Sequence, residues 1–135
     1  MPVLYELAVL GAPTDDQLAE LESIVGRAVQ AFGLRLGPEV GWSVRPAAFA
    51  PNQRNASAAV FFGAPGVTAT GLDALLQRAI PILPVVSDIA KVRDEVPEAL
   101  RHINCLDYRA GGAQRVATGL LECAGLLPRQ RRVFL

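Results

Sequence analysis

The sequence is poor in the residues that build most metal and redox sites. It contains one histidine, His102, and two cysteines, Cys105 and Cys123, which do not form a CxxC pair. A structural zinc site needs four such ligands, so we expect no metal site. The two thiols are expected to be buried and reduced, as in a cytoplasmic protein, because small apolar thiols are common core residues.

The chain also lacks an excess of either charge. It has 13 basic and 13 acidic residues, which gives a net charge of +0. Proteins that bind nucleic acid or anionic membranes carry positive fields, so we expect neither partner. No apolar run approaches the roughly 20 residues of a membrane span, and Glu6 interrupts the apolar N-terminus, which has no basic region before it. We therefore expect a cytoplasmic location.

Sequence motifs for nucleotide binding and for serine nucleophiles are missing as well. There is no GxxxxGK[ST] loop and no GxSxG elbow. The loop at residues 11–14 offers only the Thr14 hydroxyl, and Pro13 has no N–H to donate, which argues against a flavin phosphate site. Asp15 and Asp16 suit the start of a helix better than a magnesium site. We expect no cofactor.

What the sequence does contain is an alternation of apolar and amphipathic segments. Its 135 residues are 51% hydrophobic, enough for one domain with its own core. We expect strands over residues 3–10, 42–49, 58–62, 80–86 and 104–108, with the wholly apolar third strand at the centre. Helical segments between strands imply a parallel sheet covered on both faces. The expected fold is an α/β three-layer sandwich with a parallel five-stranded sheet, TIR-like or flavodoxin-like.

The helices can be predicted together with their buried faces. Thr14 and Gln17 form a capping box at the start of the first helix, and Gly33 is expected to end it. Residues 87–96 are expected to be irregular and residues 97–102 to form a short helix. The apolar faces of the three longer helices follow three- and four-residue steps; they comprise Leu18, Leu21, Val25, Ala28, Val29 and Phe32, then Leu72, Leu75, Leu76 and Ala79, then Ala113, Val116, Ala117, Leu120, Leu121 and Ala124.

The stretch from Ala58 to Leu100 carries a family resemblance. It contains the apolar strand 59–62, a helix with Ala74-Leu75, a strand with Pro81 and Pro84, and a proline-led segment at 97–100. This stretch resembles a Toll/interleukin receptor (TIR) domain of a bacterial signalling or defence protein. Members that cleave NAD place a glutamate at the start of the central helix, and counting back from Pro81 puts Gly71 there. The resemblance therefore implies the fold without the catalytic carboxylate.

Two functions of different classes follow. The first is a non-catalytic sensing or protein-interaction module that self-associates or packs on a TIR effector domain. The alternative is a small enzyme that hydrolyses NAD or transfers a glycosyl group at the strand ends, with Asp73, Asp107 or Tyr108 acting. We expect residues 1–128 to form one domain and 129–135 to be a basic linker and a candidate first strand of a following TIR domain.

Overall fold

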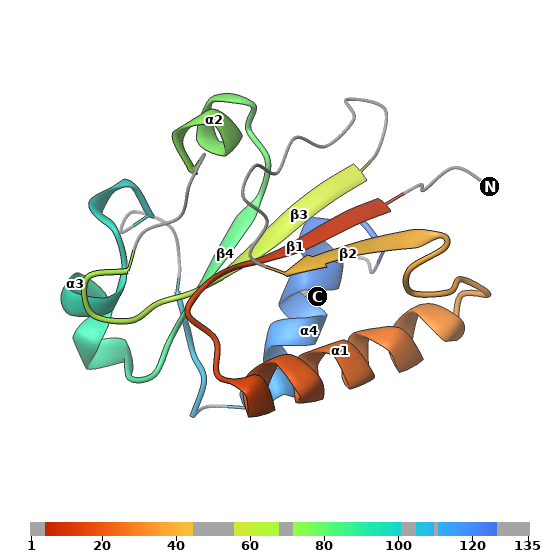
Figure 1. Ribbon diagram of the computed structural model, residues 1–135, viewed down its shortest axis with the longest axis horizontal. Helices are drawn as coiled ribbons and strands as arrows, with labels where there is room; N and C mark the ends of the chain where they lie inside the picture. Colours follow the sequence, from red (N-terminus) through yellow and green to blue (C-terminus); the bar gives the residue numbers. More distant parts are fainter. Residues whose placement is uncertain (1–4, 45–55, 68–71, 101–104, 110, 127–135) are drawn as a thin grey trace, which may run out of the picture.

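The computed structural model describes residues 5–44, 56–67, 72–100, 105–109 and 111–126. Within them five strands form one all-parallel sheet in the order β2-β1-β3-β4-β5 (Figure 1). The strands are β1 Tyr5–Gly11, β2 Val40–Val44, β3 Ala56–Phe62, β4 Ile82–Val86 and β5 Leu106–Asp107. The central position of β3 is as expected, and this strand order is the one that flavodoxin-like sheets adopt.

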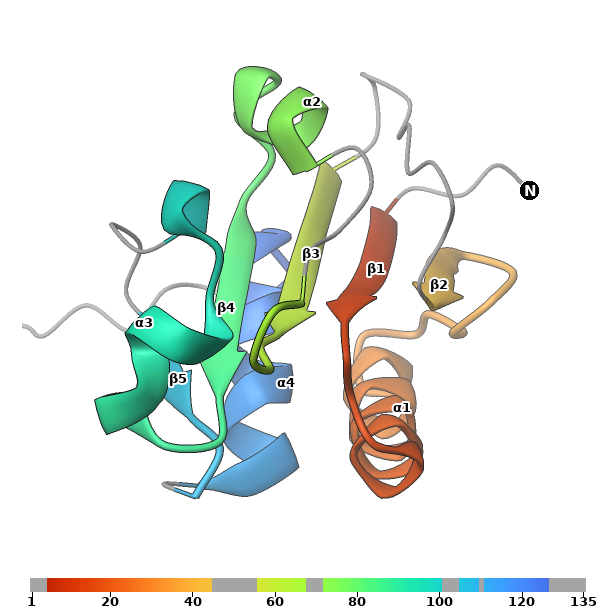
Figure 2. The ribbon, with the colours of Figure 1, turned by 60° about the vertical axis from the view of Figure 1, so that its left-hand side comes forward.

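Helices cover both faces of the sheet, which confirms the α/β sandwich (Figures 1 and 2). On one face, α1 (Asp15–Gln30) and α4 (Gly112–Cys123) pack on a large apolar cluster that includes Val9, Val60 and Leu120. On the other face lie α2 (Leu72–Gln77), α3 (Val92–Glu95) and the 3₁₀ turn η2 (Glu98–Leu100), around a smaller cluster that includes Phe61. Adjacent β3 residues therefore point to opposite faces, as the pleat of a strand requires.

The long helix α1 begins where the sequence indicates. The Thr14 N–H donates to Gln17 Oε1 (2.9 Å), and the Gln17 N–H donates to Thr14 Oγ1 (3.1 Å), which is the predicted capping box. The helix ends at Gln30 with Ala31 as its C-cap, and Gly33, with φ +76°, lies in the turn that follows and not at the cap. Phe32 lies beyond the last helical residue and is 48% exposed, so its assignment to the buried face was wrong.

The buried faces of α1 and α4 are otherwise close to those expected. Leu21, Val25 and Val29 of α1 are buried. All six predicted core residues of the last helix are buried: Ala113, Val116, Ala117, Leu120, Leu121 and Ala124. A three- to four-residue apolar period over three or more turns is therefore a sufficient signal on this face.

The second face departs further from the sequence expectations. Helix α2 ends at Gln77, and Ala79 is exposed with φ +57°, so Ala79 does not belong to the inner face. Residues 87–96, expected to be irregular, contain the 3₁₀ turn η1 (Ile89–Lys91) and α3. Asp88 starts η1, because its Oδ1 accepts a hydrogen bond from the Ala90 N–H (3.0 Å). Turns this short have no apolar period to detect.

Strand ends and the remaining expectations differ in smaller ways. β2 begins at Val40 and not at Trp42, and β4 begins at Ile82 and not at Ile80. Both cysteines pack against the apolar clusters but are half-buried, so their expected full burial was wrong. None of the described helices is both long and apolar enough to cross a bilayer. Gly71, His102 and the 129–135 segment lie outside the described residues.

Candidate functional site

The carboxyl ends of the strands are the place to look for a site, because ligands of open parallel sheets bind there. The chain order reverses between β1 and β3, which are neighbours in the sheet although β2 lies between them in sequence. The loops that follow β1, β3, β4 and β5 all meet at this end, shown at the bottom of Figure 2. Each loop brings a different set of contacts to it.

At the point of reversal, the end of β1 lies beside the end of β3, with Gly11 paired in register with Phe62. The Ala12 N–H donates to the carbonyl oxygen of Phe62 (2.9 Å). A Cβ atom on Gly11 would stand 2.1 Å from that oxygen, and φ of Gly11 is +82°. Only glycine fits both the backbone angle and the space. The two strand ends are therefore joined by backbone in direct contact.

Between β3 and β4, the backbone of α3 makes a similarly close approach. A Cβ atom on Gly63 would lie 2.6 Å from the carbonyl oxygen of Glu95 and 3.2 Å from its Cβ. Glycine at this position lets the Glu95 backbone pass across the end of β3.

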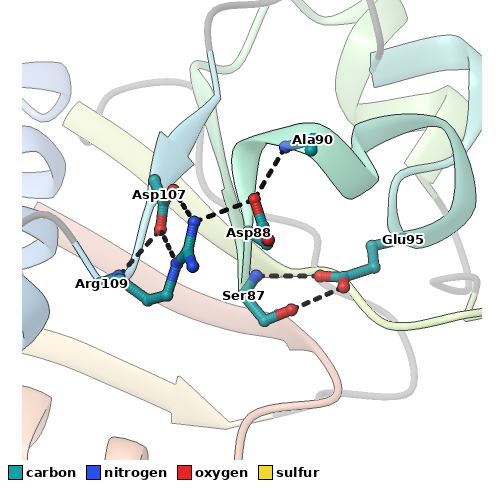
Figure 3. Close-up of polar contacts among 6 residues, drawn as sticks. All are labelled: Ser87, Asp88, Ala90, Glu95, Asp107 and Arg109. Carbon is teal, nitrogen blue, oxygen red and sulfur yellow. Dashed lines mark hydrogen bonds and ion pairs between the residues drawn. The ribbon is translucent and has the colours of Figure 1, made fainter.

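The Glu95 side chain is held at the end of β4 (Figure 3). It is 4% exposed and is the one buried charged residue among those the structure describes. Its Oε1 accepts a hydrogen bond from the Ser87 N–H (2.9 Å), and its Oε2 accepts one from the Ser87 hydroxyl (2.6 Å). Short hydrogen bonds to both oxygens offset the cost of burying a carboxylate. The pair closes the segment from Ser87 to Glu95 into a compact loop.

A second polar group sits beside it, between β4 and β5 (Figure 3). The Arg109 guanidinium contacts Asp88 Oδ1 (2.9 Å) and Asp107 Oδ2 (3.2 Å). The Arg109 N–H also donates to Asp107 Oδ1 (2.9 Å). The hydrogen bond and charge of Asp107, and then the charge of Asp88, raise the pKa of Arg109, so it stays charged. Because the arginine side chain is 65% exposed, we treat this group as a surface network.

Tyr108 turns away from this network, toward the face covered by α1. Its hydroxyl donates to Glu20 Oε2 (3.3 Å), and its ring lies 6.2 Å from the Phe62 ring. Burial raises the pKa of Tyr108, and the nearby Glu20 charge and hydrogen bond raise it further. Burial likewise raises the pKa of the Cys105 thiol, which keeps it protonated and a weak nucleophile at neutral pH.

The structure does not bring the three sequence candidates to one place. Asp107 and Tyr108 are adjacent at the end of β5, but their side chains contact different groups. Asp73 belongs to α2, which Figure 2 shows at the other end of the sheet, near the start of β4. Sequence reasoning missed the Ser87–Glu95 pair and the Asp88–Arg109 contact. A serine and an aspartate directly after an apolar strand were the available signal.

Neither metal ligation nor similarity to known proteins assigns a function to this site. Within the described ranges, no group of three or more His, Cys, Asp or Glu residues could hold a metal ion. A scan against protein-family models, a search of curated proteins and a search of solved structures each found no significant match.

Proposed function

We propose that this domain is a non-catalytic sensing or protein-interaction module of a bacterial signalling or defence protein. The observation that carries the proposal is that the polar side chains at the strand ends are engaged with one another. Ser87 pairs with Glu95, Arg109 joins Asp88 to Asp107, and Tyr108 contacts Glu20.

Such engagement disfavours chemistry at this end of the sheet. A carboxylate that stabilises positive charge on a ribose must face the substrate. Both oxygens of Glu95 accept from Ser87, and both oxygens of Asp107 contact Arg109. Freeing either carboxylate would cost the hydrogen bonds that now satisfy it. A network of this kind suits a rigid surface better than a reactive centre.

The backbone contacts support the same view. The carbonyl oxygen of Glu95 approaches Gly63 closely, which places backbone atoms at the end of β3, and β1 and β3 are paired side by side up to Gly11 and Phe62. These are the strand ends at which a doubly wound sheet receives its ligand. The signalling or defence context rests on the TIR resemblance, in which Gly71 stands where NAD-cleaving members have glutamate.

The experiment is an assay of nicotinamide release from NAD by the purified chain. We expect no turnover above the uncatalysed rate, with an NAD-cleaving TIR enzyme as the positive control. Turnover that Asp107→Asn or Tyr108→Phe abolishes would contradict the proposal and favour the glycosyl-transfer alternative. Turnover lost only with Asp73→Asn would place the chemistry at α2 and contradict it equally.

A further inference from the structure

The two edges of the sheet differ in how they are protected against pairing with another chain. Natural proteins keep edge strands from pairing by making them very short or by placing charges on them. The β5 edge has both features: it is two residues long, and Asp107 carries the ion pair to Arg109. The β2 edge, at the other side of the sheet in Figure 2, is five residues long with the sequence VGWSV and no charge.

The hydrogen bonds at Val40 show which β2 residues point outward. The Val40 N–H donates to Arg35 O (3.1 Å), and Val40 O accepts from the Gly37 N–H (2.7 Å). Both groups of Val40 therefore point away from β1, toward the chain's own 35–37 loop. In a parallel ladder the N–H and C=O of one residue point to the same side, and successive residues alternate. Gly41 and Ser43 hence bond to β1, while Trp42 and Val44 direct their backbone groups outward.

Among the described residues, nothing accepts or donates to these outward groups of Trp42 and Val44. The side chains on this edge are apolar as well. Val44 is 40% exposed, although it lies on the same side of the strand as Trp42, which packs on the α1 and α4 cluster. An uncharged strand with two outward-facing residues and an exposed valine is an open pairing site.

We propose that this edge binds a second copy of the same chain, with the two β2 strands antiparallel about a two-fold axis at Ser43. The inference rests on the proposed interaction function and names its partner. Two identical edges related by a two-fold axis must run antiparallel. In that register Trp42 of one copy exchanges hydrogen bonds with Val44 of the other, and the reverse, giving about four bonds.

A second copy fits this edge for three reasons. Among the described residues, the 35–37 loop satisfies the outward groups of Val40 and none pairs with Trp42 or Val44, and a two-fold axis at Ser43 uses those two residues. The exposed Val44 side chain comes to lie beside Trp42 of the other copy, a favourable aromatic–aliphatic pair. The residue on the axis is Ser43, which lies on the opposite face of the sheet from Trp42 and Val44. Its side chain is small, so it would not hold the two strands apart. A contact this small predicts a weak, concentration-dependent dimer.

Disulfide trapping tests the register. With Cys105→Ala and Cys123→Ala as background, Ser43→Cys should form a covalent dimer on mild oxidation. The two Ser43 Cα atoms would be about 4.5 Å apart, as in a non-hydrogen-bonded antiparallel pair. Val44→Cys is the matched control: it is more exposed, but its Cα atoms would be ~8 Å apart, too far for a disulfide. Equal trapping at both positions would overturn the register.

Sedimentation of the intact chain tests the edge itself. Val44→Pro removes an outward N–H that the chain's own sheet does not use, so the fold should be retained. It should weaken the dimer by about tenfold or more, whereas Val44→Thr, which keeps the N–H, should not. A parent chain that remains monomeric up to ~1 mM, or an unaffected Val44→Pro dimer, would overturn the inference. Neither result would bear on nicotinamide release, which tests the proposed function separately.

Discussion

The two faces of the sheet are built in different ways. The face covered by α1 and α4 has two helices of 16 and 12 residues and a continuous apolar cluster that draws on four of the five strands as well. The face covered by α2 and α3 has helices of six and four residues and a smaller cluster. It also holds the one buried charge among the described residues, Glu95.

The difference shows two sources of order within one domain. Long amphipathic helices bury much apolar area, which stabilises them without any particular polar contact. Helices of four to six residues bury little and cannot hold themselves together. On the second face, the backbone contact at Gly63 and the Ser87–Glu95 pair fix the position of α3, which the small buried apolar area alone does not. The free energy of unfolding should therefore depend on buried apolar volume on the face covered by α1 and α4. On the face covered by α2 and α3 it should depend on specific contacts.

The largest expected effect comes from removing apolar volume on the first face. Leu21 and Leu120 are fully buried, so Leu21→Ala and Leu120→Ala should each cost about 2–5 kcal/mol in urea unfolding. Leu75→Ala on the second face should cost less, because its half-buried neighbours Leu76 and Ile80 can move into the space. Gln114→Ala, exposed on α4, is the control and should stay within about 0.5 kcal/mol. A Leu75→Ala cost equal to that of Leu120→Ala would remove the distinction between the faces.

The next effect should come from adding one methyl group on the second face. In Gly63→Ala the new Cβ would stand 2.6 Å from the Glu95 carbonyl oxygen, so the backbone must shift. We expect a loss of about 2–3 kcal/mol. The control is Gly26→Ala in α1, where the nearest atom is Leu36 Cδ2 at 3.8 Å. That change should stabilise the chain by about 0.5–1 kcal/mol, since alanine is the better helix former. A neutral Gly63→Ala would mean that α3 is free to move.

The same contrast explains how much of the molecule the sequence could predict. The buried face of α4 was predicted completely, because an apolar period over three turns defines one side of a helix. The Ser87–Glu95 pair was not predicted, because it depends on how a loop folds back over Gly63. Asp107 and Tyr108 were correctly placed at the end of β5, yet adjacency in sequence does not say where side chains turn. Asp73 was expected at the strand ends, but it belongs to α2 at the other end of the sheet, because the position of a six-residue helix is set by its packing.

A smaller loss is expected from the Ser87 hydroxyl. Ser87→Ala leaves one oxygen of the buried Glu95 carboxylate without its 2.6 Å hydrogen bond. Because Ser87 is exposed and water can partly replace its hydroxyl, we expect about 1–2 kcal/mol. Ser87→Thr keeps the hydroxyl and should restore most of the loss. Hydrogen exchange of the residue 87 backbone amide should accelerate in the alanine variant, since this N–H donates to the same carboxylate. Unchanged exchange would indicate that the pair does not hold the loop.

The smallest effect concerns Tyr108 and appears only at high pH. Burial first, and then Glu20, raise the pKa of Tyr108 above its ordinary value of 10.0, so the folded chain keeps the phenol proton longer than the unfolded chain. Its contribution to stability is therefore fully present below about pH 10 and is lost as the pH rises through the folded pKa. Tyr108→Phe should differ from the parent by at most about 0.5 kcal/mol at pH 7, and the parent should lose that advantage above pH 10. Glu20→Gln removes the nearby charge, so a spectrophotometric titration should then give a lower phenol pKa; no change would show that burial alone raises it.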